Sequence, residues 1–312
     1  MNRRSFLRTS AGLSVASLLP LSMSGHRIHL APPAIKGIKL GVITYSFRSM
    51  PGSAEDLLGY VASLGLSTVE LMGDPVEAFA GAPPAPAWKR GASQEEREKF
   101  RQERAAWAAE MRKWRASADM RKFKDLRKLY EREGVKIEIV KFPLDRMEEH
   151  EIRYCFHVAE ALGARGITLE RSDEAVRKLA PYADEYKRLI GYHNHAKVNF
   201  NSWDEAVKLS PYNALNLDVG HYVAGTNESP IPLIQKYHDR ILNLHLKDRK
   251  FDNGPNMPWG EGDTPLKEIL QLMKKEKYPF MGTIELEYPI PEGSDAVKEV
   301  QKCIDFCKAA LA

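Results

Sequence analysis

The sequence has few cysteines, and none of them is placed to form a disulfide framework or a metal knuckle. Its 312 residues contain three cysteines, Cys155, Cys303 and Cys307, and no C-x-x-C pair. An odd number, with two members on one predicted helix near the C-terminus, is typical of free thiols in the core or at the surface. This pattern excludes a scaffold stapled by disulfides.

The glycines are also not arranged as a nucleotide-binding fingerprint. No G-x-G-x-x-G follows a predicted strand and opens a helix, although dinucleotide-binding folds place their glycines in that way. A nucleotide cofactor is therefore not expected.

No strong charge excess remains once the N-terminal segment is set aside. The formal net charge is +4, and Arg3, Arg4, Arg8 and Arg27 are the only charged side chains before Lys36. Without these four arginines the net charge is zero. A nearly neutral chain has no general electrostatic attraction for nucleic acid or for an anionic membrane, so a nucleic-acid partner is not expected.

The N-terminal segment has the composition of an export signal. A basic start with Arg3 and Arg4 precedes a small and apolar run from Ala11 to Leu21, which is too short to span a bilayer as a stable helix. The stretch RRSFL resembles a twin-arginine signal. We predict an export signal over residues 1–30, a periplasmic location and no stable membrane insertion; a disordered basic tail is the alternative.

After residue 36, short apolar segments alternate with amphipathic helices. Strict alternation of this kind predicts a parallel sheet, and eight such units predict a closed (β/α)8 TIM barrel. We expect one α/β domain over residues 36–312. The predicted strands are residues 38–47, 67–73, 135–142, 164–172, 189–197, 214–222, 241–249 and 280–288.

One unit is enlarged by a helical insertion after the second strand, at about residues 82–118. Ser93 and Glu96 form a capping-box pattern, and apolar side chains then recur at helical spacing. The members of this stripe are Phe100, Trp107, Met111 and Trp114. The insertion is either an extra helix packed on the barrel wall or a lid, because it leaves the C-terminal end of a strand.

Polar side chains alternate with leucines along the later strands. In a barrel both faces of each strand are buried, one against the helices and one in the interior. We therefore expect the leucines to face the helices and the polar residues to face a shared interior pocket. The polar groups that share a face are Thr68 and Glu70; Thr168 and Glu170; His193 and His195; Asn216 and Asp218; Asn243, His245 and Lys247; and Thr283, Glu285 and Glu287.

Buried carboxylates and imidazoles are costly unless a partner compensates them. The simplest common partner for His193, Asp218, His245 and Glu287 is one divalent cation, and their mixed nitrogen and oxygen donors suit Mn, Co, Zn or Fe. The alternative for any one of them is a hydrogen-bonded core side chain.

The order GYHNH, LNLDVGH, LNLHLKDR, GTIELEY resembles the xylose-isomerase-like TIM barrel superfamily, the sugar phosphate isomerase/epimerase group. The resemblance covers nearly the whole chain after the signal, and it implies one metal ion held by His193, Asp218, His245 and Glu287. Glu287 is chosen over Glu285 because the glutamate of that family falls five positions after the strand glycine, here Gly282.

The sequence departs from the resemblance on the fifth strand, where HNH replaces the usual ENH. One member of the usual pair of proton-transferring glutamates is therefore missing or relocated. The candidates for proton transfer are Glu170, Glu285, His195 and Lys247, and the candidates for substrate contact are Tyr45, Glu70, His221, Arg249 and Trp259.

These observations predict a divalent-metal-dependent sugar isomerase or epimerase that removes a proton next to a carbonyl and forms an enediolate. Its expected partner is a small sugar or keto-sugar. The resemblance to exported proteins with YHNH and HLKD implies an alternative on the same scaffold, elimination from 3-keto-glycosides. An endonuclease-IV-like nuclease and a non-catalytic carbohydrate-binding barrel also remain open.

Overall fold

The computed structural model describes residues 35–89 and 91–312. The predicted export signal, residues 1–30, lies outside the described residues. Within the described part of the chain, no helix combines the length and the apolar character that crossing a bilayer would need.

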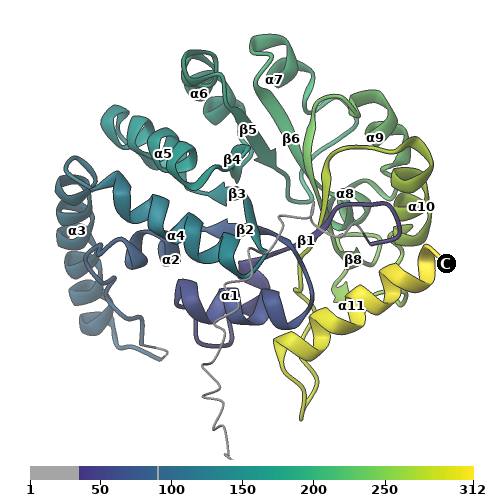
Figure 1. Cartoon of the computed structure of the whole chain (residues 1–312), viewed down its shortest axis with the longest axis horizontal. Helices are drawn as coiled ribbons and strands as arrows, with labels where there is room; N and C mark the ends of the chain where they lie inside the picture. The colour runs from purple at the N-terminus through teal and green to yellow at the C-terminus, as the bar shows by residue number, and fades with distance from the viewer. Residues whose placement is uncertain (1–34, 90) are drawn as a thin grey trace, which may run out of the picture. The chain divides into compact units, whose positions relative to one another are not determined.

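Eight parallel strands close into a barrel, which confirms the predicted TIM barrel (Figure 1). Going round the barrel, neighbours follow the order β1-β10-β7-β6-β5-β4-β3-β2. The strands are β1 (Leu40–Ile43), β2 (Thr68–Met72), β3 (Lys136–Lys141), β4 (Gly166–Glu170), β5 (Leu189–His193), β6 (Asn213–Asp218), β7 (Ile241–Leu246) and β10 (Met281–Ile284). The carboxyl ends of all eight strands therefore meet at one mouth.

Helices surround the barrel and follow the strands in sequence (Figure 1). The helices are α1 (Ala54–Ser63), α2 (Gly73–Phe79), α3 (Gln94–Arg115), α4 (Met120–Arg132), α5 (Glu149–Leu162), α6 (Asp173–Tyr186), α7 (Asp204–Leu209), α8 (Val219–Thr226), α9 (Ile231–Tyr237), α10 (Leu266–Glu276) and α11 (Ala296–Ala310). A short antiparallel pair, β8 (Asp248–Arg249) and β9 (Asn256–Met257), follows β7.

All eight strands are shorter than predicted, the first and the last most of all. β1 ends at Ile43 and passes into a 3-10 turn over Thr44–Phe47. β10 ends at Ile284, so Glu285 and Glu287 lie beyond the regular strand. Strand alternation therefore does not decide which way these two side chains point.

The barrel interior has an apolar layer below a polar one. Ile139, Ala214, Leu242 and Met281 form a small cluster separate from the main core. The prediction that the leucines face the helices was wrong for Leu242, which belongs to this interior cluster. The pairing of β6 with β7 slips between Leu215 and Asn216, so that Leu242 is skipped. The extra residue of such a bulge changes which way the following side chains point. Leu242 then fills the interior.

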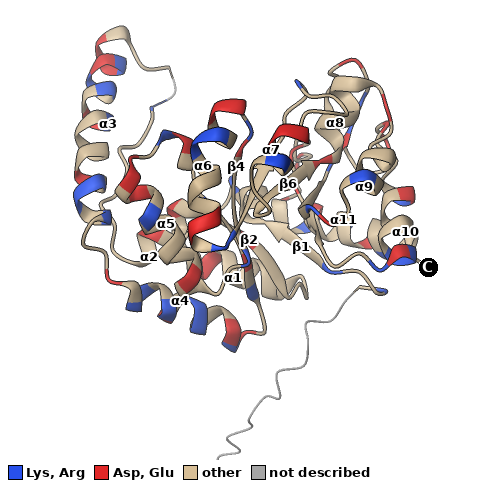
Figure 2. Ribbon diagram, turned by 90° about the horizontal axis from the view of Figure 1, so that it is seen from above, with Lys and Arg blue, Asp and Glu red and all other residues tan. Residues whose placement is uncertain are grey.

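The insertion contains α3, which follows α2 along the chain and starts with the predicted capping box. The Ser93 backbone nitrogen donates to Glu96 over 2.7 Å, and the Glu96 nitrogen donates to Ser93 Oγ over 3.2 Å. The first half of α3 stands away from the barrel and carries charges of both signs (Figure 2). Met111 is buried, and Trp114 packs edge-on against Tyr154 of α5.

Arg115 joins the end of α3 to the barrel. Its guanidinium lies 2.7 and 2.9 Å from the two oxygens of Glu77 in α2, and 2.7 Å from Glu151 in α5. All three side chains are almost fully buried. The insertion is therefore both a helix packed on the wall and a structure beside the mouth.

Candidate active site

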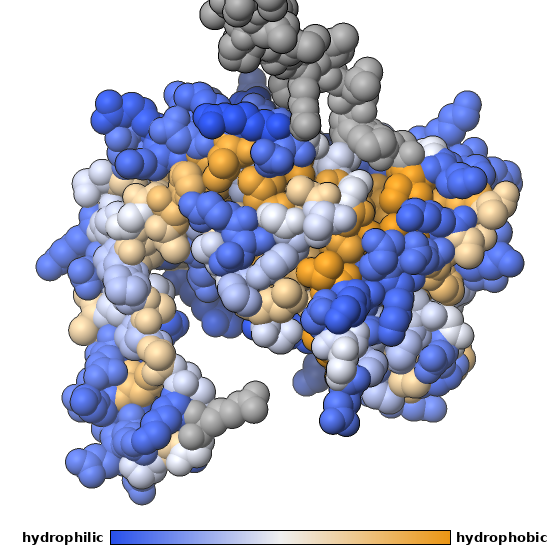
Figure 3. All heavy atoms as spheres, turned by 60° about the horizontal axis from the view of Figure 1, so that its bottom comes forward, coloured by the Kyte–Doolittle hydropathy of each residue, from blue (hydrophilic) through white to orange (hydrophobic). Residues whose placement is uncertain are grey.

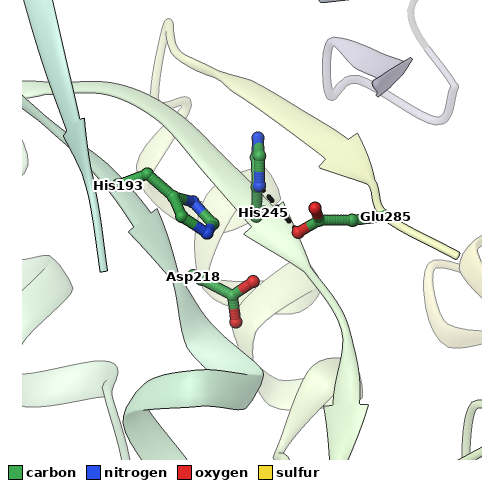
Figure 4. Close-up of side chains that lie close together, drawn as sticks. All are labelled: His193, Asp218, His245 and Glu285. Carbon is green, nitrogen blue, oxygen red and sulfur yellow. Dashed lines mark hydrogen bonds and ion pairs between the residues drawn. The ribbon is translucent and has the colours of Figure 1, made fainter. Parts of the chain in front are cut away.

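Four side chains from four neighbouring strands converge at the mouth of the barrel (Figure 4). His193 ends β5, Asp218 ends β6, His245 lies in β7, and Glu285 follows β10. Each offers one ligand atom, and these atoms all lie within 4.8 Å of one another. The barrel order places β5, β6, β7 and β10 side by side, which is why residues almost a hundred positions apart meet here.

His245 is held between two carboxylates. Its Nδ1 lies 2.8 Å from Glu285 Oε2, and its Nε2 lies 2.7 Å from Glu70 Oε2. Burial alone would lower the pKa of His245, but Glu70 and Glu285 raise it to about 10. A metal at Nδ1 would replace the proton that faces Glu285, while Glu70 would fix the ring from behind.

Lys247 places a positive charge within the same group. Its Nζ lies 3.0 Å from Asp218 Oδ2, 3.0 Å from Glu285 Oε2 and 2.6 Å from Glu287 Oε2. Burial works against the charged ammonium, but Asp218, Glu285 and Glu287 raise the pKa of Lys247. Burial would also raise the pKa of Glu285, yet Lys247 and His245 hold it well below its usual range. The position between Asp218 and Glu285 therefore suits a cation.

Two buried atoms of the group lack a hydrogen-bond partner in the described structure. His193 Nδ1 has none, and Asp218 Oδ2 accepts no well-aligned bond even though Lys247 Nζ is near. Burial, followed by the charge of Lys141, holds the pKa of His193 well below its usual range, so its imidazole is neutral. Neutral imidazole and carboxylate are the forms that bind divalent metals. The residues present therefore fit a metal ion of the class expected from the sequence.

A second pair of side chains lies at the rim beside His193. His195 Nε2 is 2.8 Å from Glu170 Oε2, and Lys141 Nζ is 2.8 Å from Glu170 Oε1. Burial would raise the pKa of Glu170, but His195 and Lys141 lower it to about 2. Contact with Glu170 raises the pKa of His195, whose side chain is 64% exposed. The His195 ring lies 5.4 Å from that of His193.

His221 and Arg249 lie next to Lys247. Arg249 Nη1 lies 2.6 Å from His221 Nδ1, and Lys247 Nζ lies 3.1 Å from His221 Nε2. Burial, followed by the charge of Lys247, lowers the pKa of His221 to about 3. Asp218 Oδ1 accepts from the His221 backbone nitrogen and caps α8. The predicted substrate contacts His221 and Arg249 therefore adjoin the group of four.

Glu287 does not join that group, and this differs from the prediction. The structure places Glu285 there, whereas Glu287 pairs with Lys247 and accepts from Asn256 over 3.4 Å. Because β10 ends at Ile284, the spacing from Gly282 does not carry through to Glu287. By position, Glu285 is the better candidate ligand, and Glu287 serves as a partner for Lys247.

Three predicted substrate contacts have different placements. Glu70 is fully buried, and its oxygens accept from Thr168 and Asn243 as well as contacting His245, so we correct its role to orienting His245. The Trp259 ring packs edge-on against the Phe306 ring of α11, with the ring centres 5.8 Å apart. Trp259 is therefore a packed side chain in a surface turn. Tyr45 is 39% exposed, with Arg48 over its ring.

Two polar residues that the sequence analysis did not single out support the site. Asn194 Oδ1 accepts from the Asp218 backbone nitrogen over 2.9 Å, and its Nδ2 donates to the Asp218 carbonyl over 3.1 Å. Lys141 holds Glu170 from the end of β3. Lys141 lies near the end of the predicted strand 135–142 and is the last residue of β3, and Asn194 separates the two histidines near the end of another predicted strand, so strand ends were the signal for both.

A cavity of about 810 Å³ opens beside the group of four, between the barrel mouth and the insertion. Its walls are the ends of β2, β3 and β4, together with α2, α3 and the start of α5. Glu170 and Lys141 line it, so it reaches the rim pair next to His193. The arrangement combines a cation-binding group, an adjacent acid–base pair and room for a ligand, which defines a candidate active site of a (β/α)8-barrel enzyme.

The chain belongs to the xylose isomerase-like TIM barrel family, whose model matches residues 58–310. The match covers all the strands except β1, and the four converging residues all lie within it.

The proteins that resemble this chain include named dehydratases and an epimerase. The chain is 30% identical over 139 residues to an inosose dehydratase of Clostridium beijerinckii; the alignment covers 43% of this chain and 38% of that protein. The matched segment therefore spans well under half of this relative. Two solved structures share the fold at 13% identity. One is the probable 3-DHS dehydratase involved in petrobactin synthesis from Bacillus anthracis, with a TM-score of 0.60 over 86% of this chain and 99% of that one. The other is D-psicose 3-epimerase from Clostridium cellulolyticum H10, with a TM-score of 0.59 over 88% of this chain and 99% of that one.

Proposed function

We propose that this protein is a divalent-metal-dependent lyase that removes a proton next to the carbonyl of a cyclic keto-sugar and then expels a neighbouring oxygen substituent. The observation that carries the proposal is the convergence of His193, Asp218, His245 and Glu285 on one space, with the Lys247 ammonium already between two of the carboxylates.

His193, Asp218, His245 and Glu285 would hold the metal. When bound, the ion would polarise the substrate carbonyl and acidify the neighbouring C–H bond. Glu70 keeps the His245 ring in place from the buried side, and Asn194 fixes the backbone of Asp218. These contacts keep the donor atoms in position before any ligand arrives, as a precise site requires.

His195 and Glu170 are the proton-transferring pair in this proposal. The contact between His195 Nε2 and Glu170 orients the ring and leaves the other ring nitrogen free to exchange a proton with substrate. Removal of the proton turns the C–H electron pair into the C=C bond of an enediolate or enolate. The C–O bond on the next carbon then breaks, and its oxygen takes up a proton and leaves as water or an alcohol.

Elimination is favoured over isomerisation for two reasons. The sequence relatives are named dehydratases, and a dehydratase removes water from its substrate. In addition, the fifth strand supplies His193 where an acidic residue would provide a second proton-transferring group. Isomerisation or epimerisation remains the second candidate, because it shares the proton-removal step and structural neighbours include 3-epimerases.

The test is a reaction in deuterated water, followed by proton NMR. The protein loaded with Mn²⁺, Co²⁺ or Zn²⁺ is offered a 3-keto-glycoside, an inosose and a free ketose. We expect an unsaturated ketone and a released alcohol or water. A deuterated isomer would favour isomerisation, and the absence of both product and exchange with all three substrates would reject the proposal.

The metal role has its own measurement. Asp218→Asn keeps the shape of the side chain but removes a charged donor, so we expect metal affinity by titration calorimetry to fall at least about a hundredfold and turnover to fall with it. Asp263→Asn is the matched control, because Asp263 pairs with Lys250 at the surface. Full activity of the Asp218→Asn protein without bound metal would contradict the proposal.

The proposal includes export, as expected from residues 1–30. Fusing these residues to a reporter that matures only outside the cytoplasm, with Arg3 and Arg4 replaced by lysine as the comparison, measures it. Reporter export that does not depend on the two arginines would reject the twin-arginine route.

A further inference from the structure

The cavity of about 810 Å³ lies beside the group of four, and none of these four residues lines it. Its nearest lining residues to the group are Glu170 and Lys141, and from there it extends under α3. Figure 3 shows the arm of the chain that carries α3 standing apart from the body of the barrel, with a hollow between them. At about 810 Å³ the cavity is near the upper end of sites that hold drug-sized ligands. A single sugar ring bound at the metal would leave most of it empty.

The lining of the cavity has the chemistry of a site for a second ring. Trp107 lines it, with its Nε1 donating to the Pro83 carbonyl over 3.0 Å, and the Arg104 guanidinium lies 4.5 Å from the Trp107 ring centre. Apolar side chains and guanidinium groups together suit a ring that has both a flat face and polar substituents. Further apolar side chains and guanidinium groups in this lining include those of Met72, Met111, Phe142, Arg112 and Arg146.

The walls of the cavity are fixed in advance. Arg115 binds Glu77 and Glu151 and so ties α3 to both α2 and α5. The Trp107 ring cannot turn freely, because its nitrogen is bound to Pro83. A preformed wall loses little conformational entropy on binding, so each contact that it makes adds to affinity.

We infer that the insertion forms a subsite for the substituent of a glycoside, a second ring joined through oxygen to the reacting sugar, and that Trp107 sets this specificity. The inference rests on the proposed function for the reacting ring only. A second sugar and an aromatic ring share the chemistry that the cavity recognises, and the experiment separates them.

The experiment compares Trp107→Ala with Trp88→Ala. Trp88 lies before α3, is 53% exposed and packs on Phe100, away from this cavity lining. The substrates are a 3-keto disaccharide, a 4-nitrophenyl 3-keto-glucoside and free 3-keto-glucose. We expect Trp107→Ala to lower kcat/KM about tenfold for one or both glycosides, mainly through KM, and to leave free 3-keto-glucose nearly unchanged. Trp88→Ala changes none of them.

Binding is measured in parallel, so that the two proposals fail separately. Titration calorimetry with the unoxidised disaccharide and with 4-nitrophenyl glucoside should show binding to the wild type and to Trp88→Ala, and weaker binding to Trp107→Ala. Binding without turnover would reject the proposed function and keep the subsite. The subsite would be overturned if Trp107→Ala lowered kcat/KM equally for the free sugar and the glycosides, or lowered it for neither. It would also be overturned if no glycoside bound to the wild type.

Discussion

The two halves of the barrel mouth are built differently. The half formed by β5, β6, β7 and β10 is filled with charged side chains that contact one another at 2.6 to 3.0 Å. The half above β2, β3 and β4 is hollow, and its far wall comes from the insertion. One scaffold thus keeps a dense polar group on one side and an open cavity on the other.

The different construction of the two halves suits two different tasks, binding a cation and holding part of a substrate. A group that binds a cation needs donors fixed within a few ångströms, which neighbouring strand ends of a closed barrel provide. A subsite for part of a substrate needs volume and adaptable chemistry, which an inserted loop and helix provide without disturbing the strands. Changing one half should therefore leave the other nearly intact.

The largest expected effect comes from cutting the tie between α3 and the barrel. Arg115→Ala leaves Glu77 and Glu151 buried without their positive partner. We expect the free energy of unfolding, measured by urea titration, to fall by about 3 kcal/mol, while metal affinity per folded molecule stays nearly unchanged.

Arg101→Ala is the matched control for that change. Arg101 is on the same helix and pairs with Glu98 at 3.1 Å, but both side chains are more than half exposed. An exposed pair contributes at most about 1 kcal/mol. Equal losses for the two variants would show that the buried triad does not anchor the insertion.

An intermediate effect should distinguish the two glutamates after β10. Glu285→Gln removes a donor from the group of four, so we expect metal affinity to fall about tenfold or more. Glu287→Gln changes a residue that contacts Lys247 and leaves the four donors in place, so metal affinity should stay nearly unchanged. Calorimetry with Mn²⁺ or Co²⁺ measures both, and the reverse order would restore Glu287 as the ligand.

The smallest effect lies at the opposite end of the barrel, where β3 begins. Glu138 pairs with Lys39 at 3.1 Å and Lys136 at 2.8 Å. Burial would raise the pKa of Glu138, but the two lysines lower it below its usual value. Folded protein therefore holds the proton less tightly than unfolded protein. The stabilisation is present above the unfolded pKa of about 4.3 and is lost as pH falls through the folded pKa.

Glu138→Gln removes that pH-dependent contribution. We expect it to lower the free energy of unfolding by about 1 kcal/mol at pH 7, with the gap to wild type narrowing below about pH 4. Urea titrations at the two pH values measure this. If the difference in free energy of unfolding between wild type and variant grew at low pH, the pKa of Glu138 would not be lowered by folding. A change in metal affinity would show that the two ends of the barrel are coupled.

Much of the fold could be predicted from the sequence, because the alternation of strands and helices is a local pattern. The capping box at Ser93 and Glu96 was correct for the same reason, since it depends on residues three apart. The predicted strands were all too long, the first and the last most of all. The end of β10 depends on its neighbours, because the backbone N–H of Leu286 donates a hydrogen bond to Ser46 Oγ instead of extending the strand.

The candidate site could be predicted only in part. Strand alternation brought His193, Asp218 and His245 to one interior face, and the structure places them together. The same rule failed for Leu242, because a slip in the pairing of β6 and β7 is decided between strands. It placed Glu285 and Glu287 on the shared face, and both contact Lys247, but it could not decide which of the two joins the group of four, because both lie after the end of β10.

The sequence alone determined the eight-unit barrel and the kinds of donor near the strand ends, because both follow from which residues are apolar and how they are spaced. The tertiary structure decided which donors share one space, that Glu70 supports His245, and that the insertion encloses a cavity. These depend on the closure of the barrel and on buried pairs such as Arg115 with Glu77, which join residues far apart in the chain.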